Sequence, residues 1–263
     1  MGARPYGEWV HVLERGAEVP DALSPYLEVD RSQLTHECWV TGHMVAGLDG
    51  TASVDGRVGS LSTTPDQALF RRMRQIADIV LVGAETVRRE RYGPIMLSEG
   101  AQAQSRRHRQ RSNPPIAVVS RSLAFDWTAE VFAGAPADAR THVITCAAAD
   151  PERRAEAERV AEVIVAGEDR VEPAAALQAL AERGYQAVLC EGGPTWLGEL
   201  VAADRLDELC LTIAPLMGVD LLPVSVTPPG AGLATFELQG AMTEDHTLFL
   251  RYERQPQTGG RGE

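Results

Sequence analysis

The chain has 263 residues, of which 44% are hydrophobic and 24% charged, a balance typical of a globular domain rather than of a disordered chain. Its formal net charge of -12 argues against nucleic acid as a partner, because phosphate backbones bind to concentrated basic surfaces. No apolar run approaches the roughly 20 residues that span a bilayer, and no signal-peptide core is visible. We therefore expect a cytoplasmic protein without a membrane partner.

The four cysteines lie far apart beside apolar residues, and no Cys-x-x-Cys or Cys/His spacing typical of a metal site occurs. We therefore expect no bound metal, and buried, reduced thiols at Cys38, Cys146, Cys190 and Cys210. Arginine carries the positive charge of the chain, since lysine is absent. Any phosphate on a ligand would therefore be bound by arginine and by backbone N–H groups.

The first part of the chain, residues 1–37, is polar and contains proline, so we expect an N-terminal extension with one short helix near Trp9–Glu14. The main domain is expected over residues 38–254. Its first strand is predicted over Cys38–Ala46 and runs into a turn, Gly47–Gly50.

A helix is predicted next, because Thr64 is a good N-cap before a proline and apolar residues follow at helical spacing. Its apolar face carries Leu69, Met73 and Ile76, and we expect its end near Asp78.

Strands and helices then alternate. The buried strand Ile79–Gly83 leads directly into a helix from Ala84, whereas residues 98–115 are rich in arginine, lack apolar periodicity and are expected to form a mobile loop. Further strands are predicted over residues 115–120, 141–146, 162–167, 187–193 and 208–215, and helices over residues 151–161, 173–184 and 194–203. This alternation predicts a mostly parallel sheet with helices on both faces.

The end of the chain changes character. Residues 234–240 and 247–253 flank a polar turn over residues 241–246, which predicts an antiparallel hairpin at a sheet edge. The tail, residues 255–263, is expected to be disordered.

Small residues follow the strands at Gly83–Arg88, Ser120–Ser122 and Glu191–Gly198. Open α/β sheets bind ligands at this carboxyl edge, and paired glycines allow a backbone to approach a pyrophosphate closely. No Gly-x-Gly-x-x-Gly occurs in the first strand–helix unit, so the standard dinucleotide fingerprint is missing.

Four segments together resemble the pyrimidine reductase domain of the deaminase-reductases of riboflavin biosynthesis and their stand-alone relatives: GLDG, LVGAETVR, VVSRSL and CEGGPTWLGELVAADRLDELCLTIAP. The similarity extends roughly from Val40 to Tyr252. It implies an α/β, dihydrofolate-reductase-like three-layer fold, a homodimer, and NADPH-dependent reduction of 5-amino-6-(5-phosphoribosylamino)uracil by hydride transfer. The deaminase motif, His-x-Glu with a later Pro-Cys-x-x-Cys, is absent.

The resemblance also implies roles for individual residues. Catalytic roles fall on Asp49, Glu191 and His43, and substrate contacts on Arg74 and Leu61. Contacts with the cofactor fall on Val45, Ala46, Gly83, Thr86, Arg88, Ser120, Arg121, Gly192, Gly193, Pro194, Thr195, Trp196 and Leu197. Within that set, Ser120 and Arg121 would lie near the adenosine 2′-phosphate, which would select NADPH over NADH.

Several of these residues have a structural alternative. Asp49 is equally suited to capping its turn, Arg74 to pairing with Asp78, and His43 to a hydrogen bond with the backbone. Glu191 favours function, because a carboxylate after an apolar strand is costly to bury.

The chain departs from the family pattern where His43 replaces a Lys or Asn and where the arginine for the substrate phosphate has no clear counterpart. Two alternatives therefore remain: a dihydrofolate-reductase-like or other small-molecule NADPH reductase, and an inactive NADP-binding regulatory protein.

Overall fold

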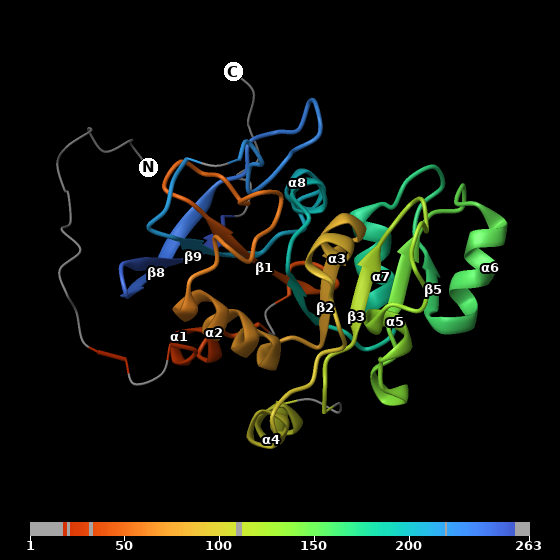
Figure 1. The fold of residues 1–263 in the computed structure, drawn as a ribbon, viewed down its shortest axis with the longest axis horizontal. Coiled ribbons are helices and arrows are strands. Elements are labelled where there is room, and N and C mark those ends of the chain that lie inside the picture. The colour runs from red at the N-terminus through yellow and green to blue at the C-terminus, as the bar shows by residue number, and fades with distance from the viewer. Residues whose placement is uncertain (1–17, 20–21, 32–33, 109–111, 219, 256–263) are drawn as a thin grey trace.

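The computed structural model describes residues 18–255 except 20–21, 32–33, 109–111 and 219. Its centre is a nine-stranded sheet in the order β5-β4-β3-β2-β6-β1-β7-β9-β8 (Figure 1). The strands are β1 (Trp39–Ala46), β2 (Ile79–Gly83), β3 (Ile116–Val119), β4 (His142–Thr145), β5 (Glu162–Val165), β6 (Ala187–Cys190), β7 (Glu208–Ile213), β8 (Phe236–Glu244) and β9 (Thr247–Arg254). The helices are α1 (Ser24–Leu27), α2 (Thr64–Met73), α3 (Ala84–Glu90), α4 (Glu99–His108), α5 (Glu130–Ala133), α6 (Pro151–Val160), α7 (Pro173–Ala181) and α8 (Pro194–Ala202), with 3-10 turns at Arg74–Ile76 and Ala137–Ala139.

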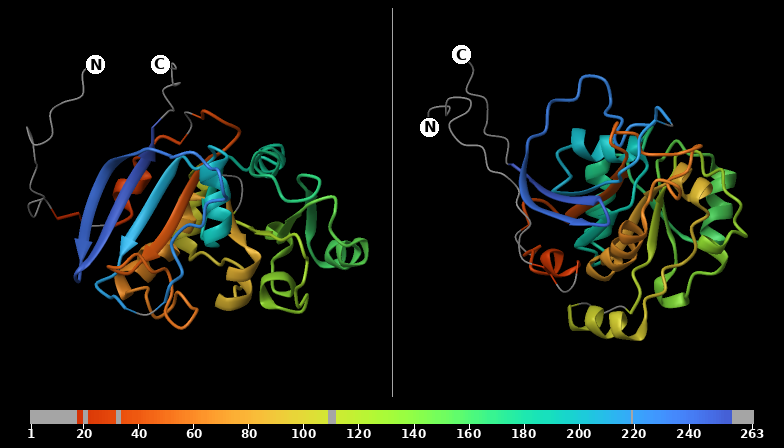
Figure 2. Two further views of the ribbon diagram at one scale, coloured as in Figure 1. Left: turned by 90° about the horizontal axis from the view of Figure 1, so that it is seen from above. Right: turned by 60° about the vertical axis from the view of Figure 1, so that its left-hand side comes forward.

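Strand direction follows the prediction. Every neighbouring pair from β5 to β7 is parallel, whereas β9 runs antiparallel to both β7 and β8. Figure 2 shows the strongly twisted sheet from above, with the β8–β9 hairpin forming one end. The mostly parallel sheet with a C-terminal antiparallel hairpin is therefore confirmed.

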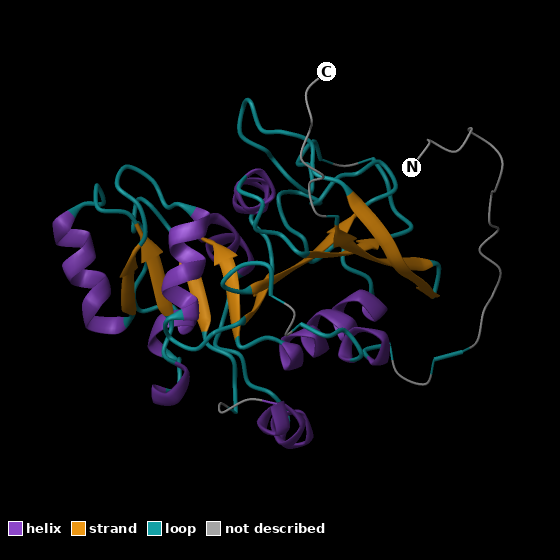
Figure 3. Cartoon of the chain, turned by 180° about the vertical axis from the view of Figure 1, so that it is seen from behind, coloured by secondary structure: helices purple, strands orange, loops and turns teal. Residues whose placement is uncertain are grey.

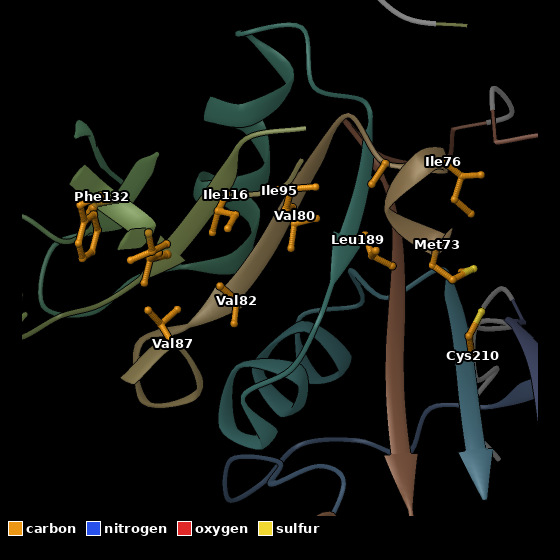
Figure 4. Close-up of a cluster of buried hydrophobic side chains, with 14 of the residues drawn as sticks. Met73, Ile76, Val80, Val82, Val87, Ile95, Ile116, Phe132, Leu189 and Cys210 are labelled. Atoms are coloured by element: carbon orange, nitrogen blue, oxygen red, sulfur yellow. The ribbon is translucent and has the colours of Figure 1, made fainter. Parts of the chain in front are cut away.

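Helices cover both faces of the sheet, as Figures 1 and 3 show from opposite sides. The side chains of β2 alternate between the two faces: Val80 and Val82 pack in a cluster that includes Met73 of α2, drawn in Figure 4. Ile79 and Leu81 pack in the other cluster, which includes apolar residues of α7 and α8. Burial on both faces explains why the central strands are continuously apolar.

Helix α4 corrects the prediction of a loop over residues 98–115. The Ser98 hydroxyl accepts a hydrogen bond from the N–H of Ala101 (3.3 Å), and Ala101 is buried. Helix-favouring residues, this cap and the burial of Ala101 favour a peripheral helix (Figure 1). The loop was predicted because the segment lacks a broad apolar stripe.

Two boundaries also differ from prediction. Thr63 rather than Thr64 is the N-cap of α2, since its hydroxyl accepts from the N–H of Asp66, and the α-helix ends at Met73. Strand β8 continues to Glu244, so most of the expected polar turn is strand. The turn itself is Asp245 and His246, with φ of 47° and 65°, values that suit a two-residue hairpin turn.

The described part of the N-terminal extension packs against the main domain. Leu23 and Tyr26 belong to the buried core, and the Arg31 guanidinium donates to the buried carboxylate of Glu208 at 2.9 Å. The expected helix near Trp9–Glu14 lies outside the described residues, as does the expected tail from residue 256 onward. Gln255, the first residue of that tail, is described, and its N–H donates to the Thr235 carbonyl at 2.9 Å.

The four cysteines are buried and free, as predicted. Within the described ranges, the helices are too short or too polar to cross a membrane.

Candidate functional site

A cavity of about 740 Å³ opens beyond the carboxyl ends of β1, β2 and β6. Helix α2, the first turns of α3 and α8, the segment after β1, and Leu222 and Val226 of the long loop after β7 form its walls. The volume is within the usual range for a small-molecule site, and the position is the one at which open α/β sheets bind ligands.

The turn Gly192–Gly193 crosses directly over the end of β2. Gly192 and Gly193 have φ of 110° and 88°, and the N–H of Gly83 donates to the carbonyl of Gly192 at 3.1 Å. A Cβ on Gly193 would lie 3.2 Å from the Cα of Gly83. The two predicted cofactor turns are therefore packed together, and Gly192 and Gly193 need glycine because both have positive φ.

Helix α8 begins immediately after this turn, with Pro194 in its first turn. The first intrahelical hydrogen bond of α8 runs from the N–H of Leu197 to the Gly193 carbonyl at 2.9 Å. The N–H groups of Thr195 and Trp196 precede this donor, so they are free to bind an anion at the positive end of the helix. The Trp196 indole N–H is buried without a hydrogen-bond partner in the described structure. Gly198 has another reason to be glycine, because a Cβ there would lie 1.9 Å from the Val226 carbonyl oxygen.

Glu191, directly after β6, forms the charged centre of the cavity with Arg74. The fully buried Glu191 carboxylate accepts from Arg74 Nε at 2.6 Å and Nη2 at 2.7 Å, and the Tyr92 hydroxyl donates to it at 3.0 Å. Burial opposes the charge of Arg74, but the ion pair with Glu191 leaves its pKa above the ordinary value. Burial, with the Glu191 charge, raises the pKa of Tyr92 well above its ordinary value.

This geometry replaces the alternative pairing of Arg74 with Asp78 by a pairing with Glu191. Arg74 pairs with Glu191, while the Asp78 carboxylate accepts from the backbone N–H groups of Gln186 and Ala187. The guanidinium of Arg74 also stacks over Phe70, 4.7 Å from the ring centroid.

His43 lies on β1 beside this pair and is buried. Its ring centroid is 5.5 Å from that of Phe70, and its Nε2 has no hydrogen-bond partner within the described residues. Burial lowers the pKa of His43, more than the nearby Asp66 and Glu191 charges raise it. Burial therefore favours the neutral imidazole.

Most of the predicted site residues line the cavity: His43, Val45, Arg74, Gly83, Thr86, Glu191, Gly192, Gly193, Pro194, Thr195 and Trp196. The others lie outside its lining: Ala46, Asp49, Leu61, Arg88, Ser120, Arg121 and Leu197.

Asp49 and Leu61 have structural contacts. The Asp49 carboxylate accepts from the N–H of Thr51 at 3.1 Å and of Gly218 at 2.6 Å, so it caps its loop, and these hydrogen bonds lower its pKa. Leu61 is buried against Val45 and Ala214.

Arginines surround the turn after β3. Arg88 donates to the Ala124 carbonyl at 3.2 Å, Arg153 of α6 donates to the Ser122 carbonyl at 2.9 Å, and Arg121 is exposed. The Ser120 hydroxyl accepts from the N–H of Leu123 at 3.0 Å. Arg153 was not predicted, because only the packing of α6 brings it to this turn.

The cavity-lining residues that sequence reasoning missed include Asp66, Phe70 and Tyr92. A signal for two of them existed. Asp66, Phe70 and Arg74 recur every four residues, which places them on one face beside the apolar stripe of α2. Nothing in the sequence signals Tyr92, which meets Glu191 from a segment 99 residues away.

Residues 38–226 match the RibD C-terminal domain family. The 2,5-diamino-6-ribosylamino-4(3H)-pyrimidinone 5′-phosphate reductase of Archaeoglobus fulgidus is 30% identical over 181 residues, 68% of this chain and 80% of the relative. The protein of the same name from Methanothermobacter thermautotrophicus is 29% identical over 179 residues, 65% of this chain and 77% of the relative.

Solved structures share the fold. A pyrimidine reductase-like protein from Corynebacterium diphtheriae superposes with a TM-score of 0.76 at 27% identity, covering 84% of this chain and 93% of that one. The riboflavin biosynthesis reductase of Saccharomyces cerevisiae, at 16% identity, has a TM-score of 0.60 over 83% of this chain and 90% of its own. The chain therefore belongs to the RibD C-terminal domain family, which confirms the expected relationship to the reductases of riboflavin biosynthesis and the enzymatic class, an oxidoreductase.

Proposed function

We propose that this chain is a cytoplasmic, homodimeric, NADPH-dependent reductase that converts the ribosylamino group of a 6-ribosylaminopyrimidine 5′-phosphate to ribitylamino. The observation that carries the proposal is that one cavity combines a glycine turn at a helix N-terminus with the buried cluster of His43, Arg74, Glu191 and Tyr92. Family membership and the names of the curated relatives support the same reaction.

The residues present fit a dinucleotide. The Gly192–Gly193 turn lines the cavity with backbone, since its two residues carry no side chains, and the N–H groups of Thr195 and Trp196 stand at the positive end of α8. Val45 and Thr86 line the same cavity. NADPH, when bound, supplies a hydride; the protein binds it, orients the rings and excludes water.

The preference for NADPH is proposed from the arginines around the Ser120–Ala124 turn. Arg88 and Arg153 each donate one N–H to a carbonyl of this turn, and Arg121 beside them is exposed. The charge of Arg88 is partly balanced by its ion pair with Glu85 at 2.8 Å, so Arg121 and Arg153 supply most of the positive charge at this turn. A 2′-phosphate would accept charge-assisted hydrogen bonds there.

The substrate end of the cavity is proposed to lie at Glu191 and Arg74. The ion pair fixes the carboxylate, so it can accept hydrogen bonds from ribose hydroxyls without reorganising. His43, neutral and unpartnered at Nε2, is able to give or take one proton. Arg71 and Arg91 also line the cavity, and we propose them for the substrate phosphate, for which the sequence offered no counterpart.

The experiment is oxidation of NADPH, followed by its near-ultraviolet absorbance, with each candidate substrate in turn. We expect turnover with a 6-ribosylaminopyrimidine 5′-phosphate and none with dihydrofolate. Turnover with dihydrofolate alone would support the dihydrofolate-reductase-like alternative. Binding of NADPH without oxidation by either substrate would support a regulatory protein.

A further inference from the structure

Asp66 is a buried acid that has no role in the reduction proposed above. It lies in the first turn of α2, its residue is 2% exposed, and it lines the cavity. Its Oδ2 accepts from the Ser62 hydroxyl, whereas its Oδ1 is buried without a hydrogen-bond partner in the described structure. An acceptor-only group left in this state costs free energy, which a ligand donor would recover.

A purely structural role would place this side chain differently. An acid in the first turn of a helix interacts favourably with the helix dipole while it remains in water, and it commonly accepts from the backbone. In α2, however, the Thr63 hydroxyl is the cap, and it accepts from the N–H of Asp66. The Asp66 carboxylate is therefore not required as a cap. Asp66 is instead buried in the wall of the cavity.

The groups beside Asp66 suit a planar heterocycle. Phe70, one turn further along α2, presents a ring to the same cavity, and the unpartnered Nε2 of His43 lies next to that ring. A neutral imidazole can donate to a ring carbonyl, and a carboxylate accepts from ring N–H and amino groups. An acceptor, an aromatic face and a possible donor are thus brought together on one side of the cavity.

Resting on the proposed function, we propose that Asp66 determines which pyrimidine is reduced, by accepting hydrogen bonds from the adjacent N3–H and 2-amino groups of a 2-amino-4-pyrimidinone. Uracil carries a carbonyl at C2, and that oxygen would face the carboxylate with no proton between them. A site built to bind a donor rejects an analogue that lacks it, because buried polar groups are left unpaired. The 2,5-diamino substrate, rather than the uracil expected from the sequence, is then preferred.

The preference has a consequence for the order of reactions. A reductase that needs the 2-amino group acts before that group is lost. A later product with a carbonyl at C2 would then require hydrolytic deamination of the reduced pyrimidine, in which water replaces the amino group and ammonia leaves.

The test uses calorimetry without cofactor, so that recognition is measured apart from turnover. We expect the 2,5-diamino-6-ribosylaminopyrimidinone 5′-phosphate to bind about 10- to 10²-fold more tightly than 5-amino-6-(5-phosphoribosylamino)uracil, the range of one charge-assisted hydrogen bond. In Asp66→Asn the difference should fall to within about threefold, since the amide can donate to the C2 carbonyl. Asp138→Asn, an exposed acid on the 3-10 turn after α5, is the matched control and should keep the preference.

Equal affinities of the wild-type protein for the two pyrimidines would overturn the proposal, and this comparison needs no variant to fold. A preference that persists unchanged in a folded Asp66→Asn protein, checked by circular dichroism, would overturn it as well. NADPH oxidation is measured separately. A binding preference without oxidation would reject the reductase function and leave the Asp66 assignment standing. Equal oxidation of both pyrimidines would reject the Asp66 assignment and leave the reductase function standing.

Discussion

Glu191 combines two roles that the sequence could not separate. Its carboxylate faces the cavity, and it is also the buried partner of Arg74, with both contacts shorter than 2.8 Å. Replacing it therefore changes the chemistry and leaves a buried guanidinium without its counter-charge. A test at Glu191 must therefore measure catalysis and stability separately.

For Glu191→Gln we expect kcat to fall by roughly 10²-fold, the range of a lost acid–base or charge contribution, with NADPH affinity nearly intact. The free energy of unfolding should fall by about 1 to 3 kcal/mol, because the amide keeps hydrogen-bonding capacity but not charge. Tyr92→Phe is the control, since it removes one hydrogen bond and leaves the ion pair. Stopped-flow kinetics, cofactor titration and denaturation measure these quantities; full activity in Glu191→Gln would contradict the assignment.

His43 predicts a pH dependence of stability. Because burial lowers its folded pKa, the unfolded chain takes up the proton first as the pH falls through the ordinary value of about 6.5. The stabilisation is complete above that pH and is lost below it, by up to about 1.4 kcal/mol per pH unit. The wild-type minus His43→Gln difference in unfolding free energy isolates this group, and a flat difference between about pH 8 and pH 5 would refute it.

Arg121 is the residue we expect to set cofactor preference. NADPH should bind at least tenfold more tightly than NADH, since charge-assisted hydrogen bonds contribute roughly 1.5 to 3 kcal/mol. Arg121→Ala should remove most of the preference. Arg140→Ala is the control, because Arg140 is also exposed but donates to carbonyls at the end of α6. Calorimetry with both nucleotides is the measurement, and equal affinities in the wild-type protein would reject the 2′-phosphate site.

At the scale of elements, the cavity depends on the contact between two strand-to-helix turns. Gly193 combines a φ of 88° with a Cβ position 3.2 Å from the Gly83 Cα. Gly184, after α7, has a similar φ of 84° and no atom within 4 Å of its Cβ position. Substitutions at Gly184 and Gly193 therefore distinguish the cost of backbone strain, which both share, from the cost of steric overlap, which only Gly193 has.

We expect Gly184→Ala to lower the free energy of unfolding by about 1 to 2 kcal/mol, the strain of a left-handed conformation. Gly193→Ala should lower it further, because the two turns must move apart, and should also weaken NADPH binding. Chemical denaturation and cofactor titration are the measurements. Normal NADPH affinity in a folded Gly193→Ala protein would show that the cofactor does not approach this turn.

At the scale of the whole molecule, apolar surface remains uncovered at one end of the sheet. Leu221 and Leu233, in the long loop between β7 and β8, are 102% and 97% exposed. Leu238 on the edge strand β8 is also exposed. Exposed apolar side chains of this kind are typical of an interface, and an open edge strand favours pairing.

We therefore predict a homodimer through this end, as the resemblance implied. Light scattering at micromolar concentration should give twice the 28.4 kDa mass of one chain. Leu221→Glu should shift the protein toward monomer. Val165→Glu is the control, because Val165 is 48% exposed on β5, the edge strand at the opposite end of the sheet. A monomer mass for the wild-type protein would contradict the prediction.

The sequence by itself determined the order of strands and helices, the parallel sheet, the C-terminal hairpin and the turns at Gly83 and Gly192–Gly193. These features depend on local properties: continuous apolar runs, helical spacing, proline at helix starts and glycine at strand ends. The same locality explains the failures. Helix α4 lacks the apolar periodicity by which helices were recognised, so a loop was predicted there. The position of the hairpin turn is decided by backbone pairing between β8 and β9 rather than by the polarity of its residues.

Only the tertiary structure decided which side chains meet. Arg74 and Glu191 are 117 residues apart in sequence, and α2 and β6 must pack before their charges pair. Burial depends on the same packing: it leaves Asp49 in solvent as a loop cap and places Asp66 in the cavity, although both are acids near a turn. The desolvation of an ionisable side chain and the partner that it meets depend on where the fold places it. The chemistry of the cavity therefore followed from the fold and not from the motifs alone.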